Sequence, residues 1–292
     1  MICNICPRMC NVERVNNEKS NGFCKMPYNA VIARADLHMW EEPIISGNKG
    51  SGAIFFSGCS LRCVYCQNYD ISHNGFGKSV STERFIEIVK ELEYRGANNI
   101  NLVNPTHFIP FIVDAFNIYK PKIPIVYNSG GYERANSLRL LDGIVNIYLP
   151  DIKYFDAEVS AKYSKASNYF EYCAKAIIEM KRQVGDTLIE NDIMQKGLMI
   201  RHLILPKNTD QSIKILEWIK ENLPIDTYIS IMSQYTPCGE ISEFKELNRQ
   251  IVTAEYDKVI NKFFDLGFKN GFMQEKKSAK KIYIPKFDLT GV

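Results

Sequence analysis

Short apolar segments alternate with helical segments from residue 53 to residue 232, and this alternation constrains the fold more than any other feature. The apolar segments rich in β-forming residues span 53–58, 99–103, 123–128, 145–150, 198–205 and 227–232. Helical spacing or helix-forming composition marks 81–96, 108–119, 132–142, 157–183 and 210–222, and 184–196 is expected to be a loop. This order predicts a parallel sheet with right-handed crossovers. We therefore expect an α/β fold, specifically a partial (β/α)6 TIM-like barrel.

The length of the chain suits one large domain with shorter additions at both ends. With 292 residues, 46% of them hydrophobic, the chain can bury a complete core. We expect a Cys-rich N-terminal extension over 1–50, a barrel core over 51–240, and a C-terminal extension over 241–292 that packs on the barrel.

The charge balance indicates neither a nucleic-acid partner nor a membrane. The 36 basic and 33 acidic residues are spread through the sequence, and the one basic cluster reads as a solvated face: Lys276, Lys277, Lys280 and Lys281. The opening "MICNICPRMC" lacks the pattern of a signal peptide, and no segment reaches the ~18 apolar residues of a membrane span. We expect a cytoplasmic protein.

Seven of the nine cysteines fall into two compact groups, which are Cys59, Cys63 and Cys66, and Cys3, Cys6, Cys10 and Cys24. Disulfides are uncommon in the cytoplasm, so metal binding is the better explanation for such groups. Three thiolates on one loop can hold an iron–sulfur cube at three corners and leave one iron open to a ligand, whereas four thiolates close the site. The alternatives for the group of three are buried core cysteines or part of a zinc site completed elsewhere.

The motif Cys59-x3-Cys63-x2-Cys66, with Tyr65 before its last cysteine and a strand before its first, resembles the signature of radical S-adenosylmethionine (radical SAM) enzymes. The stretches "HMWEEPIISG", "NINLVNPTH", "IYLPDIKY", "IRHLILP" and "ISIMSQYTP" are similar to PflX-like homologues of pyruvate formate-lyase activating enzyme, over nearly the whole chain. The resemblance implies a [4Fe–4S] cluster that binds S-adenosylmethionine and, after accepting one electron, yields a 5′-deoxyadenosyl radical that abstracts hydrogen from a substrate. It also implies an electron donor such as flavodoxin or ferredoxin, and a place for Tyr65 beside the adenine.

Further candidates for cofactor binding follow the predicted strands, because parallel barrels place their chemistry at the carboxyl ends of strands. Asp151-Ile152-Lys153 resembles the Asp-x-Lys motif of glycyl-radical activating enzymes, in which the lysine pairs with the cofactor carboxylate. The alternative is a solvated charge pair in a loop. The Gly-Gly-Glu motif of many radical SAM enzymes is missing, and "NPTH" stands in its place. Asn104, Thr106 and nearby backbone carbonyls are therefore candidates to bind the cofactor amino group.

Arg201 and His202 adjoin on the fifth predicted strand, so strand alternation directs one to the lumen and the other to the helices. Arg201 is a candidate to contact the cofactor or an acidic substrate, and an ion pair with the helix layer is the alternative. His202 is a second candidate of the same kind. Cys173 and Cys238 are single cysteines, which are usually small buried hydrophobes, so neither is assigned to the site.

Cys3, Cys6, Cys10 and Cys24 form a closed set of four thiols, which predicts a second metal centre. Their spacing suits a structural zinc ion or an auxiliary iron–sulfur cluster, and it does not separate the two.

The sequence leaves the substrate open. The likeness to activating enzymes favours hydrogen abstraction from a glycine in a partner protein or another polypeptide. Radical modification of a small metabolite is an alternative, since fold and cofactor do not define the substrate. A non-catalytic zinc-binding module is the alternative from a different class.

Overall fold

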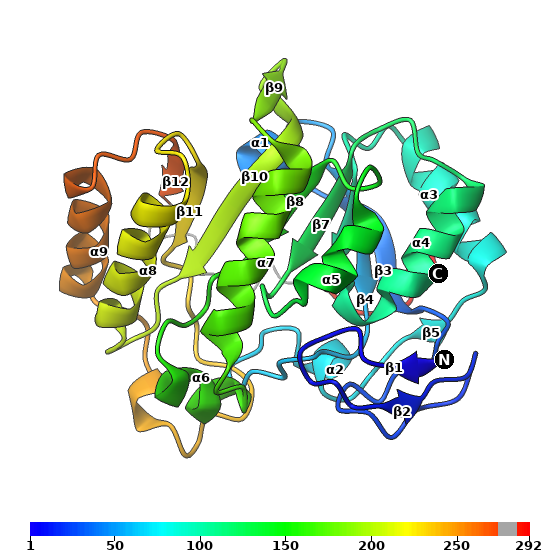
Figure 1. The fold of residues 1–292 in the computed structure, drawn as a ribbon, viewed down its shortest axis with the longest axis horizontal. Coiled ribbons are helices and arrows are strands. Elements are labelled where there is room, and N and C mark those ends of the chain that lie inside the picture. Colours follow the sequence, from blue (N-terminus) through cyan, green and yellow to red (C-terminus); the bar gives the residue numbers. More distant parts are fainter. Residues whose placement is uncertain (274–284) are drawn as a thin grey trace.

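Six apolar segments form parallel strands that are buried on both sides in the computed structural model, which describes residues 1–273 and 285–292 (Figure 1). The strands are β4 (Ser51–Phe56), β6 (Ile100–Val103), β7 (Ile125–Ser129), β8 (Ile147–Pro150), β10 (Ile193–Leu203) and β11 (Tyr228–Met232). Each pairs in parallel with the next. Their continuous apolar runs suit strands covered on both faces. The predicted partial (β/α)6 barrel is confirmed.

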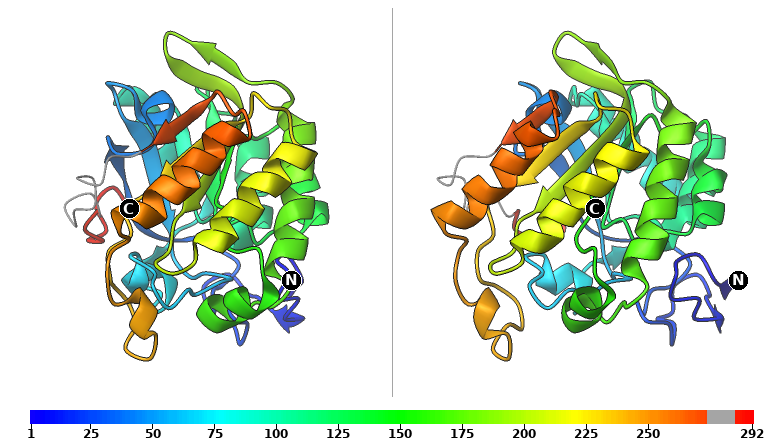
Figure 2. Two further views of the ribbon diagram at one scale, coloured as in Figure 1. Left: turned by 90° about the vertical axis from the view of Figure 1, so that its left-hand side faces the viewer. Right: turned by 60° about the vertical axis from the view of Figure 1, so that its left-hand side comes forward.

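Helices connect the strands and cover the outer face of the curved sheet (Figure 2). They are α3 (Thr82–Tyr94), α4 (Ile109–Ile118), α5 (Ala135–Leu138), α6 (Ala157–Ser164), α7 (Tyr169–Val184), α8 (Thr209–Asn222) and α9 (Thr253–Asp265), with short 3-10 turns at Thr106–Phe108, Arg139–Leu141 and Lys245–Leu247. In α3 the Ser81 hydroxyl accepts a hydrogen bond from the Arg84 amide at 3.2 Å. Such a cap satisfies a free N–H of the first turn.

Antiparallel strands extend the sheet beyond β4. Strand β3 (Val31–His38) pairs with β4 and with the short β5 (Lys78–Ser79), while β12 (Gly271–Met273) pairs in parallel with β11 at the opposite edge. The tail at 285–292 lies along β3, where the Ala35 amide donates to the Thr290 carbonyl at 2.8 Å. Residues 31–46 lie in the predicted 1–50 extension, yet they supply a sheet strand and helix α1 (Pro43–Ser46).

The prediction of a loop over 184–196 is wrong, because strand β9 (Leu188–Glu190) and the start of β10 form a hairpin there. Asn191 and Asp192 connect these strands with φ values of 51° and 63°. Two positive φ values suit a tight hairpin turn, and Asn and Asp tolerate them. The helical segment expected over 157–183 forms two helices, since Lys165 takes a left-handed φ of 51° between α6 and α7.

Helix α1 closes the amino-terminal mouth of the barrel, which leaves the carboxyl ends of the strands for the site. Ile45 packs there in a cluster with lumen residues Val126, Ile147, Leu149, Met194 and Met199. The opposite edge carries α2 (Tyr69–Ser72) and the N-terminal hairpin of β1 (Ile2–Cys3) and β2 (Val12–Glu13) (Figure 1).

No helix within the described residues is long and apolar enough to cross a membrane. The basic cluster Lys276, Lys277, Lys280 and Lys281 lies outside the described residues.

Candidate functional site

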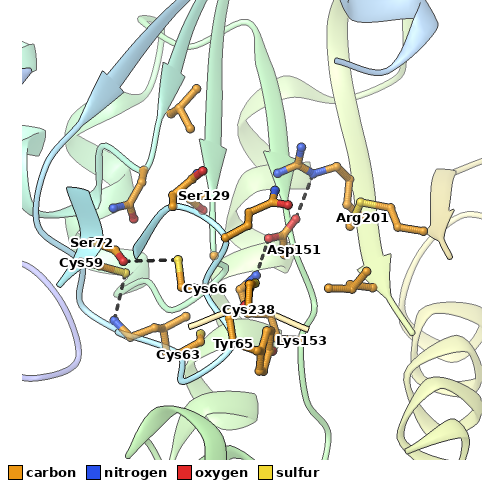
Figure 3. Close-up of a pocket in the computed structure, with 18 of the residues that line it drawn as sticks. Cys59, Cys63, Tyr65, Cys66, Ser72, Ser129, Asp151, Lys153, Arg201 and Cys238 are labelled. Atoms are coloured by element: carbon orange, nitrogen blue, oxygen red, sulfur yellow. Dashed lines mark hydrogen bonds and ion pairs between the residues drawn. The ribbon is translucent and has the colours of Figure 1, made fainter. Parts of the chain in front are cut away.

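A cavity of about 220 Å³ opens where the parallel strands end (Figure 3). Loops from separate parts of the chain supply its lining, which includes Cys59, Cys63, Tyr65, Cys66, Asn104, Asn128, Ser129, Gly130, Asp151, Lys153, Arg201, Gln234 and Cys238. The carboxyl ends of parallel strands meet at one edge of the sheet, which explains this convergence.

Each of the three loop thiols accepts at least one hydrogen bond. The Leu61 amide donates to Cys59 Sγ at 3.3 Å. The Ser72 hydroxyl donates to Cys66 Sγ at 3.3 Å, and the Ser164 hydroxyl donates to Cys63 Sγ at 2.9 Å. Hydrogen bonds to sulfur stabilise a thiolate ligand and influence the potential of a cluster.

Burial, followed by the charge of neighbouring thiols, raises the pKa of Cys59 and raises that of Cys66 to about 12. Three thiolates side by side therefore need a cation, and metal binding would displace their protons. Within residues 1–273 and 285–292, no three His, Cys, Asp or Glu side chains are arranged to hold a single metal ion. Ligands of a multi-iron cluster lie further apart than those of one ion. The three hydrogen-bonded thiols fit three corners of a [4Fe–4S] cluster.

Asp151 lies between two cations on the opposite wall of the cavity. It accepts a hydrogen bond from Lys153 Nζ at 2.6 Å and another from Arg201 Nε at 2.9 Å. Burial raises the pKa of Asp151, but the charges of Arg201 and Lys153 outweigh burial and hold it below its ordinary value. Burial lowers the pKa of Lys153, and Asp151 more than reverses that effect. All three groups are therefore charged at neutral pH.

Arg201 reaches from the cavity toward the closed end of the barrel. Its Nη1 lies 3.2 Å from Glu41 Oε2, and its Nη2 donates to Asn128 Oδ1 at 2.6 Å. Asn128 in turn donates to Glu41 Oε1 at 3.2 Å. The buried Glu42 also lies near Arg201, and burial raises the pKa of Glu42. Lys153 and Arg201 are therefore held in place before a cofactor carboxylate binds.

The two candidates from "NPTH" separate in the structure. Asn104 lines the cavity with a φ of 60°, and its side-chain amide donates to the Gly58 carbonyl at 2.7 Å. Thr106 lies outside the lining, where its hydroxyl donates to Glu133 Oε1 at 2.7 Å. Glu133 is buried, and burial raises its pKa to about 7.

Arg201 and His202 point to opposite sides of β10, as strand alternation predicts. Arg201 faces the cavity, whereas His202 faces α8, with its Nε2 2.7 Å from the Ser212 hydroxyl. Its Nδ1 lies 2.6 Å from the Ile152 carbonyl. Burial lowers the pKa of His202 to about 4, so the ring is neutral. The structure does not place His202 in the cofactor cavity.

Tyr65 is held rigidly at the wall of the cavity. Its ring packs edge-on against Tyr154, Tyr163 and Tyr235, and its hydroxyl donates to Tyr154 Oη at 2.7 Å. Tyr154 Oη lies 2.7 Å from Ser164 Oγ, the group that donates to Cys63. Its position beside the adenine stays a prediction.

The sequence reasoning missed Cys238, Glu41, Ser72 and Ser164. Cys238 lines the cavity and donates from Sγ to the Tyr65 carbonyl at 3.2 Å. It follows the strand that ends at Met232, so the rule that selected the other strand-end residues applied to it. Glu41 and Ser164 had no local signal, because their partners Arg201 and Cys63 lie 160 and 101 positions away. Ser72 lies six positions after Cys66, within reach of a local reading of the loop.

The four N-terminal cysteines lie close to one another beside the three-thiol loop. Burial, together with the charges of Cys24, Cys3 and Cys10, raises the pKa of Cys6 to about 12. Ser137 and Arg134, at the start of α5, donate hydrogen bonds to the carbonyls of Ile5 and Asn4 and attach this segment to the barrel.

The partial barrel and its three-thiol loop define a class of protein. The family profile of the Radical SAM superfamily matches residues 53–232, more than half of the chain. The chain belongs to this superfamily and is a radical SAM enzyme. The family implies a [4Fe–4S] cluster and S-adenosylmethionine, which together supply a 5′-deoxyadenosyl radical by one-electron reduction. In this chain Cys59, Cys63 and Cys66 would hold the cluster.

Among curated proteins, the chain is 29% identical over 269 residues to "Uncharacterized protein MJ0674" of Methanocaldococcus jannaschii, covering 88% of this chain and 73% of that protein. It is 25% identical over 198 residues to the pyruvate formate-lyase-activating enzyme of Listeria monocytogenes, covering 63% and 74%. The pyruvate formate-lyase-activating enzyme of Clostridium pasteurianum is 25% identical over 203 residues, covering 67% of this chain and 79% of that enzyme. The similarity to activating enzymes is thus distant.

Among solved structures, the fold is similar to Streptococcus suis SuiB bound to the precursor peptide SuiA, with a TM-score of 0.50 and 11% identity. The match covers 75% of this chain and 47% of SuiB, so this chain corresponds to just under half of that protein. This similarity concerns the fold alone.

Proposed function

We propose that this radical SAM enzyme abstracts a hydrogen atom from a glycine in a partner protein or another polypeptide, as an activating enzyme does. The proposal rests on the observation that two groups of side chains line the same cavity. The thiols of Cys59, Cys63 and Cys66 lie on one wall, and the Asp151–Lys153 pair, which resembles the activating-enzyme motif, lies on the other. The distant similarity to pyruvate formate-lyase-activating enzymes supports a polypeptide substrate.

The charged wall suits the methionine part of the cofactor. Lys153 and Arg201 are the cations for its carboxylate, and Asp151 holds both in place. Asn104 and the backbone carbonyls beside it are candidates for its amino group, and Tyr65 for the adenine. At Gly130 an added Cβ would lie 2.9 Å from Leu61 Cδ1 and 3.4 Å from Lys153 Cε, so glycine keeps the space between the two walls open.

Radical modification of a small metabolite is the second candidate for the substrate, and it shares the same site. The non-catalytic zinc-binding module considered from the sequence does not agree with membership of the Radical SAM superfamily.

The reductant is proposed to be a flavodoxin or a ferredoxin, because the reaction needs one electron at low potential. We extend the proposal to the N-terminus, where Cys3, Cys6, Cys10 and Cys24 are the candidate ligands of a second metal centre.

Anaerobic reconstitution with iron and sulfide, followed by reduction with dithionite in the presence of S-adenosylmethionine, tests the chemistry. We expect 5′-deoxyadenosine to form. Candidate polypeptides deuterated at glycine should then transfer deuterium into 5′-deoxyadenosine. Deuterium transfer from metabolites alone would contradict the polypeptide assignment, and absence of 5′-deoxyadenosine would contradict the proposed reaction.

A further inference from the structure

The N-terminal segment folds so that its four thiols lie near one another, because the charges of Cys3, Cys10 and Cys24 all raise the pKa of Cys6. The hairpin pairs Cys3 with Val12, and the Asn11 amide donates to the Cys3 carbonyl at 2.9 Å. A tight turn follows Cys6, where the Met9 amide donates to the Cys6 carbonyl at 3.0 Å. Cys3 and Cys6 are buried, and Cys10 and Cys24 are half-buried.

Every thiol of this group has an N–H donor directed at it, as thiolates bound to a metal require. The Phe23 amide lies 3.4 Å from Cys10 Sγ, and Arg14 Nη1 lies 3.8 Å from Cys3 Sγ. The other two donors are backbone amides, from Arg8 to Cys6 and from Met26 to Cys24. Arg14 is buried and also donates to the Pro27 carbonyl at 3.0 Å, which fixes its position.

The same segment is joined directly to the three-thiol loop of the barrel. Arg8, which lies between Cys6 and Cys10, donates from Nε to the Ser60 carbonyl at 2.8 Å. Its guanidinium lies 3.9 Å from the centre of the Phe23 ring, and the guanidinium of Arg62 lies 5.8 Å from that ring. Phe23 precedes Cys24, and Arg62 lies between Cys59 and Cys63. The two cysteine motifs therefore share a packed interface.

Gly58 lies where the backbones of the two motifs come close together. It has a φ of 80°, and an added Cβ would lie 3.1 Å from the Cys24 carbonyl oxygen and 2.4 Å from Met26 Cγ. Only glycine fits this conformation and this space. Gly58 immediately precedes Cys59, so a ligand residue of each group lies within one residue of the contact.

We propose that Cys3, Cys6, Cys10 and Cys24 hold an iron–sulfur cluster that passes electrons to the cluster held by Cys59, Cys63 and Cys66. The proposal rests on the proposed radical SAM function. Electron tunnelling weakens steeply with distance, and a structural zinc ion has no need of a position against the catalytic loop. Arg14 donates to the Cys3 thiol and its charge acts on Cys24, and Arg8 and Arg62 pack on Phe23, the residue before Cys24. Positive charge on this side favours the reduced, more negative state of a cluster.

One electron is conserved along this route. A reduced flavodoxin or ferredoxin gives one electron to the N-terminal cluster, which passes it to the barrel cluster and returns to its oxidised state. At the barrel, Cys59, Cys63 and Cys66 would hold the cluster that receives this electron. With S-adenosylmethionine bound, that cluster would supply one-electron cleavage of the C5′–S bond, with methionine as the leaving group and the unpaired electron on C5′.

Two matched variants test the proposal by metal content and electron paramagnetic resonance. The first carries Cys6→Ser and Cys10→Ser, and the second carries Cys59→Ala, Cys63→Ala and Cys66→Ala. With two cubane clusters in the wild type, each variant should retain roughly half of the iron and sulfide. After dithionite reduction, the second variant should still show the signal of a reduced cluster. Zinc in place of iron in the second variant would overturn the proposal even if the first variant failed to fold.

The relay is tested with a protein donor. In the Cys6→Ser, Cys10→Ser variant, reduction of the barrel cluster by reduced flavodoxin or ferredoxin should be lost in freeze-quenched samples, and dithionite should restore it. Equal reduction of wild type and variant by the protein donor would overturn the relay. Failure of the wild type to form 5′-deoxyadenosine with dithionite would instead count against the proposed function. The N-terminal cluster is tested separately, because the iron content of the second variant is measured without turnover.

Discussion

Arg201 Nε lies 2.9 Å from Asp151 Oδ1, across the point where two neighbouring strands end. The backbone strengthens this relationship, because the two residues form an isolated parallel bridge and the Ile152 amide donates to the Arg201 carbonyl at 2.9 Å. Asp151 uses its second oxygen for Lys153, so one carboxylate orients both cations of the cavity. The Asp-x-Lys motif is therefore one part of a larger network that needs Arg201.

Replacing Lys153 with alanine should weaken binding of S-adenosylmethionine more than it affects cluster assembly. A lost charged hydrogen bond costs ~1.5–3 kcal/mol, or roughly one to two decades of affinity. Titration of the cluster-loaded protein with S-adenosylmethionine measures the change. Lys175→Ala is the control, since Lys175 is exposed and pairs with Glu171 on the surface of α7. Equal affinities in wild type and the Lys153 variant would show that Lys153 does not bind the cofactor.

Replacing Cys59, Cys63 or Cys66 with alanine should abolish 5′-deoxyadenosine formation while the barrel still folds. The cluster depends on all three thiolates, whereas the core depends on strands and helices. Iron analysis checks the loss of the cluster, and thermal unfolding followed by circular dichroism checks that the barrel still folds. The matched control is Cys238→Ala in the same cavity, which should keep its iron because the Cys238 thiol donates to the Tyr65 carbonyl. Loss of iron from that variant would make Cys238 a ligand.

The buried carboxyl of Glu133 should make stability fall as pH rises. Burial raises its pKa from 4.5 to about 7, so between these values the folded protein binds more protons than the unfolded chain. The free energy of unfolding therefore decreases across this window, by at most about 1.4 kcal/mol per pH unit. Denaturant unfolding at pH 5, 6, 7 and 8 should show a smaller decrease in Glu133→Gln than in wild type.

The control for this pH dependence is Glu171→Gln, which removes an exposed carboxylate on α7. Its pH profile should follow the wild type. Identical profiles for Glu133→Gln and wild type would mean that Glu133 stays ionised in the folded protein.

Replacing Gly131 with alanine should destabilise the fold and displace Asp151. Gly131 has a φ of 76°, and an added Cβ would lie 2.3 Å from the Asp151 carbonyl oxygen. Gly143 has nearly the same φ of 77° with nothing within 4 Å, so Gly143→Ala measures the conformational cost alone, about 1–2 kcal/mol. Gly131→Ala should cost more and should also reduce affinity for S-adenosylmethionine. Equal costs in the two variants would show that the backbone adjusts without strain.

Local patterns in the sequence determined the class of fold and the first candidates for the site. Apolar runs and helical periodicity depend on near neighbours, so the strand order and the three-thiol loop could be predicted. Asp151 and Lys153 could be predicted from the sequence for the same reason, because they directly follow a strand. The hairpin also had a local signal, because Asn191 and Asp192 are typical turn residues. The prediction of a loop over 184–196 did not make use of it.

Only the tertiary structure decided which side chains share the cavity. The 3-10 turn that starts at Thr106 directs its hydroxyl to Glu133, whereas Asn104, two residues earlier, lines the cavity. Arg201 is joined to Glu41 from the far end of the barrel, and Arg8 reaches the carbonyl of Ser60. These contacts link residues 160 and 52 positions apart in the chain. Sequence spacing carries no record of such pairs, because the register of the sheet and the packing of loops at its edge create them.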